Sequence, residues 1–126
     1  MSSINRPLSG PVLTFDLREQ LAEMRGEEGY RRSGRAGRTL ARNGRFRNTL
    51  VALSDGVDVG THHADSPLSL HVLEGAVRFR AAGAEHTAAA GQLVFFAPGD
   101  AEDVRASGDT AVLVTLAAEG DDHRHD

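Results

Sequence analysis

The chain contains no cysteine and no lysine, so all of its basic side chains are arginines. Without cysteine there are no disulfides, no thiolate zinc site and no cysteine nucleophile. No run of apolar residues approaches the roughly 20 that cross a bilayer, and the segment 1–11 lacks the apolar core of a signal peptide. The sequence has no P-loop, dinucleotide fingerprint, GxSxG elbow or HExxH pair. We therefore expect a cytoplasmic protein with no membrane partner.

The length and composition of the chain indicate one globular domain, and its charge is unevenly distributed along the sequence. The chain has 126 residues, of which 40% are hydrophobic and 25% charged, which is ordinary for a single soluble domain. Residues 1–49 have a net charge of +5, residues 50–126 a net charge of −9, and the whole chain −4. The basic half either binds an acidic partner or packs against the acidic half of its own fold.

A short helix is predicted near the N-terminus. Asp16 is a typical N-cap, and Glu19 stands at the capping-box position three residues later. Apolar side chains follow at helical spacing, at Leu17, Leu21 and Met24. Glycines at 26 and 29 end the pattern. The prediction is a helix over about residues 16–25 that must dock its apolar stripe on a larger element to persist.

The rest of the chain predicts short strands separated by glycine-containing turns. The expected strands are 39–42, 46–53, 68–74, 76–80, 85–88, 92–96, 102–106 and 110–117. Such even spacing is typical of an all-β sandwich or barrel. The stretches 94–96 and 111–116 are apolar on both faces, so we expect both to lie deep in the fold.

Two stretches resemble the two sequence motifs of the cupin family. In the first, Gly56 precedes His62 by the family's spacing, and the stretch ends in VLEG at 72–75. In the second, Gly91 leads to Ala97-Pro98-Gly99 and then to Glu102. The resemblance covers roughly residues 38–117 and looks closest to small, RmlC-like single-domain cupins. It implies a double-stranded β-helix (jelly-roll) barrel over 38–118, after an N-terminal arm over 1–37 and before a disordered tail over 119–126.

The resemblance also shows where the chain departs from the family's metal site. The family holds a divalent metal with two histidines, a glutamate and a later histidine. Here His62 keeps the first position, while the next two fall on Ala64 and Leu68 and the last on Glu102. A catalytic metal needs about three protein ligands. We therefore expect no cofactor, with a divalent metal at His62 and Glu102 as the alternative.

A ligand site inside the barrel is predicted instead. Leu68, Leu70 and Val72 share one face of their strand because side chains alternate, and the family's register turns that face inward. An apolar wall there suits a small apolar or amphipathic ligand better than an ion. With His62 and Glu102 at the same cavity, these five residues form the predicted ligand-binding set.

Two functions follow from this set. The first is a small-molecule-binding protein without a tightly bound metal, in a sensor or accessory role. The second is an enzyme, either metal-dependent with atypical ligands or an acid–base catalyst in which Glu102 orients His62 as the base. The same two residues could instead form a satisfied buried pair, and the sequence does not choose between these readings.

Two partner predictions complete the analysis. The segment 31–47 carries seven arginines and no acid, a composition that can grip phosphates. Nucleic acid is nevertheless not expected, because Tyr30 and Phe46 are the only aromatic residues nearby and the whole protein is acidic. A homodimer is expected, because barrels of this family often pair and a partner would cover exposed sheet edges.

Overall fold

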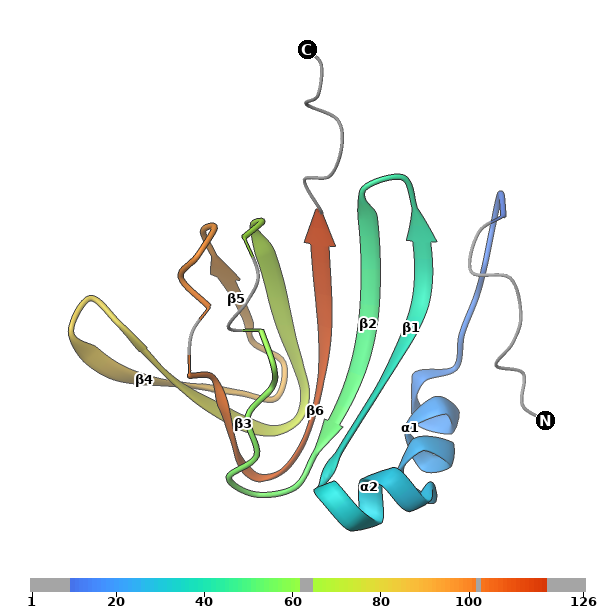
Figure 1. Ribbon diagram of the computed structural model, residues 1–126, viewed down its shortest axis with the longest axis horizontal. Coiled ribbons are helices and arrows are strands. Elements are labelled where there is room, and N and C mark those ends of the chain that lie inside the picture. Colours follow the sequence, from blue (N-terminus) through green and yellow to red (C-terminus); the bar gives the residue numbers. More distant parts are fainter. Residues whose placement is uncertain (1–9, 62–64, 102, 118–126) are drawn as a thin grey trace.

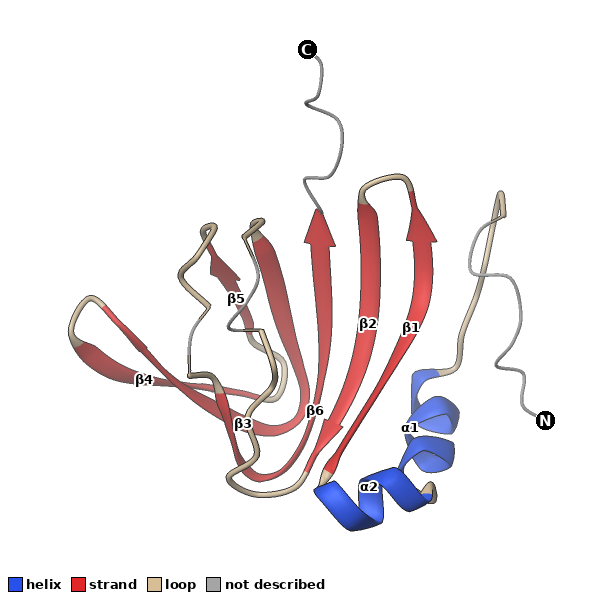
Figure 2. Ribbon diagram, in the orientation of Figure 1, coloured by secondary structure: helices blue, strands red, loops and turns tan. Residues whose placement is uncertain are grey.

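The computed structural model describes residues 10–61, 65–101 and 103–117. In this part of the chain two helices precede six strands: α1 (Leu17–Arg25), α2 (Glu28–Ser33), β1 (Arg35–Asn43), β2 (Phe46–Leu53), β3 (Leu68–Ala81), β4 (Ala84–Ala89), β5 (Leu93–Phe96) and β6 (Arg105–Ala117). The strands form one antiparallel sheet in the order β1-β2-β6-β3-β4, and β5 pairs with the first half of β3. The helices lie beside β1 at one end of the sheet, and the β3–β4 hairpin lies at the opposite end (Figures 1 and 2). The predicted all-β class is confirmed.

The predicted N-terminal helix is confirmed at both its start and its buried face. The side chain of Asp16 accepts a hydrogen bond from the backbone N–H of Glu19 at 3.1 Å, which makes it the N-cap. Leu21 and Met24 are buried against the sheet. Neither helix of the described chain has the length and apolar character that crossing a bilayer requires.

The sheet is buried on both faces over β2 and β6. One cluster fills the interior of the curved sheet and includes Val51, Leu53 and Val112. The other lies between the outer face and α1 and includes Leu50 and Ala52. Side chains alternate between the two clusters along β2, as the period of a strand requires. This explains why β2 and β6 read as continuous apolar runs.

The structure corrects the predicted number of strands. The expected strands 68–74 and 76–80 form one long strand, β3, and residues 105–117, for which two strands were expected, form one strand, β6. Gly75 is not a turn, because it lies where the register between β3 and β6 shifts on either side of Glu74. Gly108 likewise stays inside β6 with a φ of +80°. A glycine in a bulge and a glycine in a turn look alike in sequence. Here β3 and β6 pair on both sides of each glycine, so neither glycine forms a turn that ends its strand.

Three smaller differences concern local burial and boundaries. The helix α2 lies in the N-terminal arm, where only the helix over about 16–25 was predicted. The strand β1 begins at Arg35, within the segment that the sequence assigned to the N-terminal arm. On β5, Phe96 is buried, but Phe95 is 66% exposed, so that strand does not lie deep on both faces. No helix covers its outer side.

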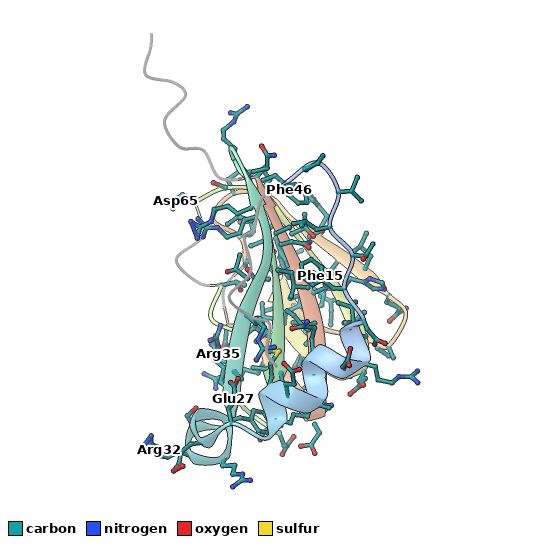
Figure 3. The ribbon with its side chains drawn as sticks, turned by 90° about the vertical axis from the view of Figure 1, so that its right-hand side faces the viewer. Phe15, Glu27, Arg32, Arg35, Phe46 and Asp65 are labelled. Atoms are coloured by element: carbon teal, nitrogen blue, oxygen red, sulfur yellow. The ribbon has the colours of Figure 1, made fainter. Side chains whose placement is uncertain are left out.

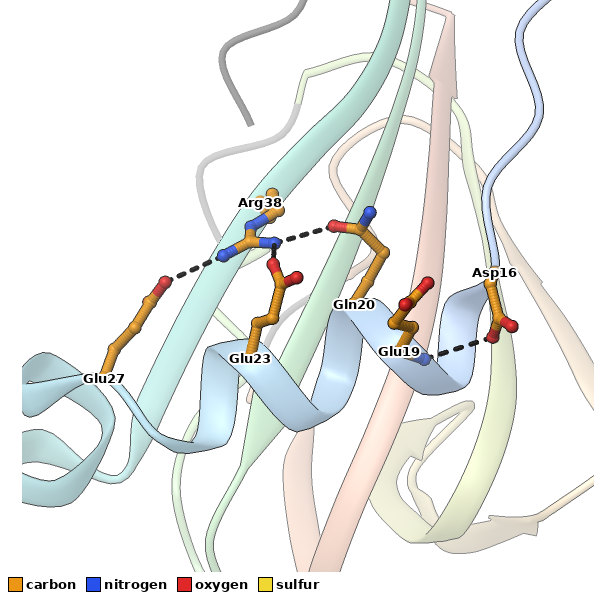
Figure 4. A network of polar contacts seen from close by, with 6 residues as sticks. All are labelled: Asp16, Glu19, Gln20, Glu23, Glu27 and Arg38. Atoms are coloured by element: carbon orange, nitrogen blue, oxygen red, sulfur yellow. Dashed lines mark hydrogen bonds and ion pairs between the residues drawn. The ribbon is translucent and has the colours of Figure 1, made fainter. Parts of the chain in front are cut away.

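Arg38 joins the helical layer to the sheet (Figure 4). Its guanidinium donates to Gln20 at 2.7 Å and to Glu23 at 2.8 Å, both on α1. It also donates to Glu27, between the helices, at 2.8 Å. The Arg38 side chain is only 15% exposed, so these charge-assisted bonds are partly shielded from solvent. They fix α1 against the outer face of β1.

Removing this guanidinium is expected to weaken the docking of α1. Arg38→Met keeps most of the side-chain stem and should lower the free energy of unfolding by about 1 kcal/mol, since the two carboxylates are half-exposed and screened. Urea denaturation measures the change. The control is Arg32→Met, because the exposed Arg32 side chain has no hydrogen bond or ion pair in the described chain and should change stability by less than about 0.5 kcal/mol. Equal effects of the two variants would contradict the role given to Arg38.

The bulge at Gly75 is expected to tolerate no side chain. A Cβ there would lie 2.3 Å from the backbone oxygen of Asp109, and φ is +74°. Gly83 has nearly the same φ, +77°, but open space around it. Gly83→Ala should therefore cost about 1 kcal/mol for the left-handed backbone, while Gly75→Ala should cost at least about 2 kcal/mol more from the clash. Thermal unfolding of both variants tests this, and similar losses would contradict the bulge.

Candidate functional site

The interior face of β3 carries the predicted apolar wall. Leu68, Leu70 and Val72 are all buried in the interior cluster. They pair across the sheet with Leu116, Val114 and Val112 of β6. The predicted inward orientation of this face is confirmed, and it defines which side chains of the neighbouring strands also point inward.

A pocket of about 320 Å³ opens on this concave side, between β1, β2, β6, the start of β3 and the loop 59–61. It has one apolar and one polar wall. The apolar side chains that line it are Val51, Val59, Leu68, Val114 and Leu116. The polar ones are Arg35, Arg47, Thr49 and Thr61. Among the described residues that line it, both charged groups are cationic and none is acidic.

Arg35 is held in place by the backbone of the loop. Its Nε and one terminal nitrogen donate to the carbonyl oxygen of Val59 at 3.1 and 2.8 Å. Two glycines make room for the guanidinium, because a Cβ at Gly60 would lie 3.0 Å from it and a Cβ at Gly37 would lie 3.4 Å away. Figure 3 shows Arg35 at the start of β1, on the side turned away from α1. Part of its donor set stays available, since a guanidinium has five N–H groups.

Arg47 lies on β2, where it pairs with Arg42 of β1 and with Leu116 of β6. Its Nε is buried and has no hydrogen-bond partner. Within the described chain the Arg47 side chain forms no ion pair either. A buried donor left unpaired costs about 1–3 kcal/mol, and more when the group is charged. The described residues therefore supply no acceptor to this atom.

The loop that closes the pocket is itself anchored to the opposite segment. Val59 donates from its backbone N–H to Val104 at 2.8 Å, and the hydroxyl of Thr61 donates to the carbonyl of Ala101 at 3.1 Å. The carboxylate of Asp58 accepts from the N–H of Gly60 at 2.7 Å. The carbonyl of Val59 that orients Arg35 is therefore fixed by the fold.

The predicted site residues fall into three groups. His62 and Glu102 lie outside the described residues, and so does His63. Leu68 lines the pocket. Leu70 and Val72 are fully buried beneath it in the interior cluster.

The described wall does not fit a divalent metal. Leu68 stands at the family's glutamate position and presents a buried apolar side chain without a donor atom. Across residues 10–61, 65–101 and 103–117 there is no group of three or more His, Asp or Glu side chains placed to hold an ion. Two cationic guanidinium groups line the same pocket. We derive no chemistry through a metal from these residues.

A larger hollow of about 580 Å³ lies between the tip of the β3–β4 hairpin and the segment after β5. Two of the three charged side chains that line it already have partners. Asp103 already accepts from Arg105 at 2.8 Å, and Arg80 donates to the carbonyl of Gly83. This hollow is larger than the concave pocket, but the unsatisfied donor of Arg47 favours the concave pocket as the ligand site.

Sequence reasoning placed Arg35 and Arg47 in a general basic segment and did not assign them to the pocket. The signal was the alternation of Arg47, Thr49 and Val51 in β2, where Val51 is an interior side chain. Residues two apart in a strand share a face, so an inward Val51 implies an inward Arg47. The position of Arg35 had no such signal, because it depends on the carbonyl of Val59, which is distant in sequence.

No protein-family model matches the chain, and comparison with curated proteins gives no match. Solved structures do resemble it. A conserved protein of unknown function from Streptococcus pyogenes superimposes with a TM-score of 0.66 at 19% identity, over 94% of this chain and 96% of that one.

Two further structures carry the cupin description. A cupin-2 domain protein from Shewanella frigidimarina has a TM-score of 0.63 at 16% identity, over 80% of this chain and 91% of its own. An RmlC-like cupin from the same organism has a TM-score of 0.60 at 19% identity, over 70% and 80% of the two chains. At these identities the similarity concerns the fold, and the chain has the fold of a small cupin barrel with short N-terminal helices.

Proposed function

We propose that the chain is a small-molecule-binding protein of cupin fold that acts without a tightly bound metal, in a sensor or accessory role. The observation that carries this proposal is the concave pocket, with its apolar wall from β2, β3 and β6 and its polar wall of arginines and threonines. Ligand sites are typically concave and mostly apolar, with a few convergent polar groups. A volume of about 320 Å³ lies near the lower end of the range for such sites, which favours a small molecule.

The composition of the walls supports an amphipathic ligand. Each buried CH₂ group contributes about 0.8 kcal/mol to binding, so a short alkyl chain against Leu68, Val114 and Leu116 gives weak but measurable affinity. The hydroxyl of Thr49 and the two guanidinium groups then orient the polar end. The predicted catalytic pair, His62 and Glu102, lies outside the described residues, and the enzyme alternative and the homodimer both stay predictions.

Binding in the pocket can be tested with six-carbon probes that differ only in their head group. We expect at least one of 1-hexanol, hexanamide and hexanoate to shift the backbone amide resonances of Thr49, Gly60 and Val114 in a ¹H–¹⁵N NMR titration. Thr49→Phe should fill the pocket and weaken that probe at least about tenfold. The control is Thr39→Phe, because Thr39 is the cross-strand partner of Thr49 but does not line the pocket.

Thr39→Phe should keep the affinity within about threefold, and both variants suit a strand because aromatic residues favour it. Circular dichroism verifies their folding. If no probe shifts these resonances, or if the two variants bind equally well, the pocket is not the binding site and the proposal fails.

Metal independence is a separate expectation. With alanine at 64 and leucine at 68, fewer than the roughly three ligands needed for a catalytic metal remain at the family's positions. The purified protein should therefore show the same Tm with and without EDTA, and elemental analysis should find well below one metal ion per chain. Stoichiometric metal, or a large fall in Tm on adding EDTA, would refute this part of the proposal.

A further inference from the structure

We infer that the ligand of the concave pocket is a small organic oxyanion, a carboxylate or phosphate on a short apolar body, whose anionic group is bound by Arg47 with Arg35 as the second cation. This inference rests on the proposed function and adds the chemical class of the ligand. It also assigns the anion-binding group to a residue on β2, outside the sequence motifs on which the resemblance to cupins depends.

The first argument is the unsatisfied Nε of Arg47. This atom is buried, and it has no hydrogen-bond partner in the described chain. An Nε together with a terminal N–H forms one edge of the guanidinium fork, which matches two oxygens of a carboxylate or phosphate. An oxyanion would satisfy both donors and neutralise the charge. A neutral amide or alcohol supplies one acceptor and no compensating charge.

The second argument is the preorganisation of Arg35. The bond from its Nε and one terminal nitrogen to Val59 leaves the other terminal nitrogen unengaged by the described residues. These two hydrogen bonds to the Val59 carbonyl hold the guanidinium in position, so less conformational entropy is lost when an anion binds.

The third argument is a contrast between the arginines on the two faces of the sheet. Arg38 points to the opposite face of β1, where two carboxylates and one amide oxygen satisfy it. In the part of the chain that the structure describes, Arg35 and Arg47 form no ion pair and no acidic residue lines their pocket. The fold thus supplies acceptors to Arg38 on the helix side, whereas Arg35 and Arg47 on the concave side have no acid among the described residues to pair with.

The apolar wall decides what carries the anion. Val51, Leu68 and Val114 stand in the same pocket as the two guanidinium groups, so an inorganic ion alone would leave this wall unused. A nucleic-acid strand is not favoured, since no aromatic residue among those that line the pocket is available to stack on a base. A short alkyl or similar apolar group attached to the anion contacts both walls.

The test compares matched six-carbon probes on the full chain by NMR titration or calorimetry. Hexanoate or hexyl phosphate should bind at least about tenfold more tightly than hexanamide, which has the same length but no charge, because charge-assisted bonds to arginine exceed neutral ones. The two anions separate a carboxylate preference from a phosphate preference. Tighter binding of hexanamide, or equal binding of all three probes, overturns the inference while the proposed function stands.

Variants then assign the anion to Arg47. Arg47→Met should remove the preference for the anionic probes while leaving hexanamide binding within about threefold. The control is Arg42→Met, which changes the net charge equally on the cross-strand partner of Arg47 but does not line the pocket. The Arg42→Met variant should keep the preference for the anionic probes. Arg47→Lys retains the charge without the fork and should retain only part of the preference.

Each remaining outcome also decides the matter. If Arg42→Met and Arg47→Met weaken anion binding equally, the attraction is the general field of the basic hairpin, and the inference is wrong. If no probe binds at all, the inference and the proposed function fail together. Circular dichroism and a cooperative unfolding transition verify that every variant is folded.

Discussion

The burial of β2 and β6 on both faces is the constraint on which the rest of this structure depends. The interior cluster requires Val51, Leu53 and Val112 on one side, and α1 requires Leu50, Ala52 and Ala111 on the other. A register slip of one residue in either strand would exchange these two sets. Because both faces are apolar, what resists the slip is the packing of side chains of different size, together with the polar contacts at the edges of each cluster.

This constraint also sorts the arginines of the N-terminal half by face. Arg38 pairs with Leu50 in the sheet and therefore lies on the helix side, where Gln20, Glu23 and Glu27 receive its donors. Arg47 pairs with Leu116, an interior residue, and therefore lies on the concave side. The basic half of the chain thus partly neutralises its own acids and partly presents unsatisfied charge to the pocket.

Local signals in the sequence predicted local structure well. The cap at Asp16 and the stripe of Leu21 and Met24 gave the helix, and the bounds predicted for β2 are those observed. The inward face of β3 followed from alternation and the cupin resemblance. Errors arose where pairing between distant segments decides the outcome. The breaks expected at Gly75 and Gly108 are absent because β3 and β6 support each other through both positions.

The candidate site shows the same division between local and distant information. Leu68 reaches the pocket as the motif predicted, whereas Arg35 reaches it through a carbonyl at residue 59 that no local pattern could reveal. Arg47 was accessible in principle from its two-residue spacing to Thr49 and Val51. It was missed because a segment with seven arginines reads as a surface, and composition hides the side chains in it, Arg35 and Arg47 among them, that point inward.

The charge of the pocket bears on the question of metal more directly than the missing ligands do. Arg47, Leu116 and Leu68 stand in one row across β2, β6 and β3, so Leu68 lies two strand spacings, about 10 Å, from Arg47. A guanidinium at this distance repels a divalent cation. The leucine at the family's glutamate position and the inward arginine therefore have the same effect. We therefore treat the absence of metal and the class of ligand as one physical proposal, in which both residues disfavour a cation at this wall and favour an anion with an apolar body.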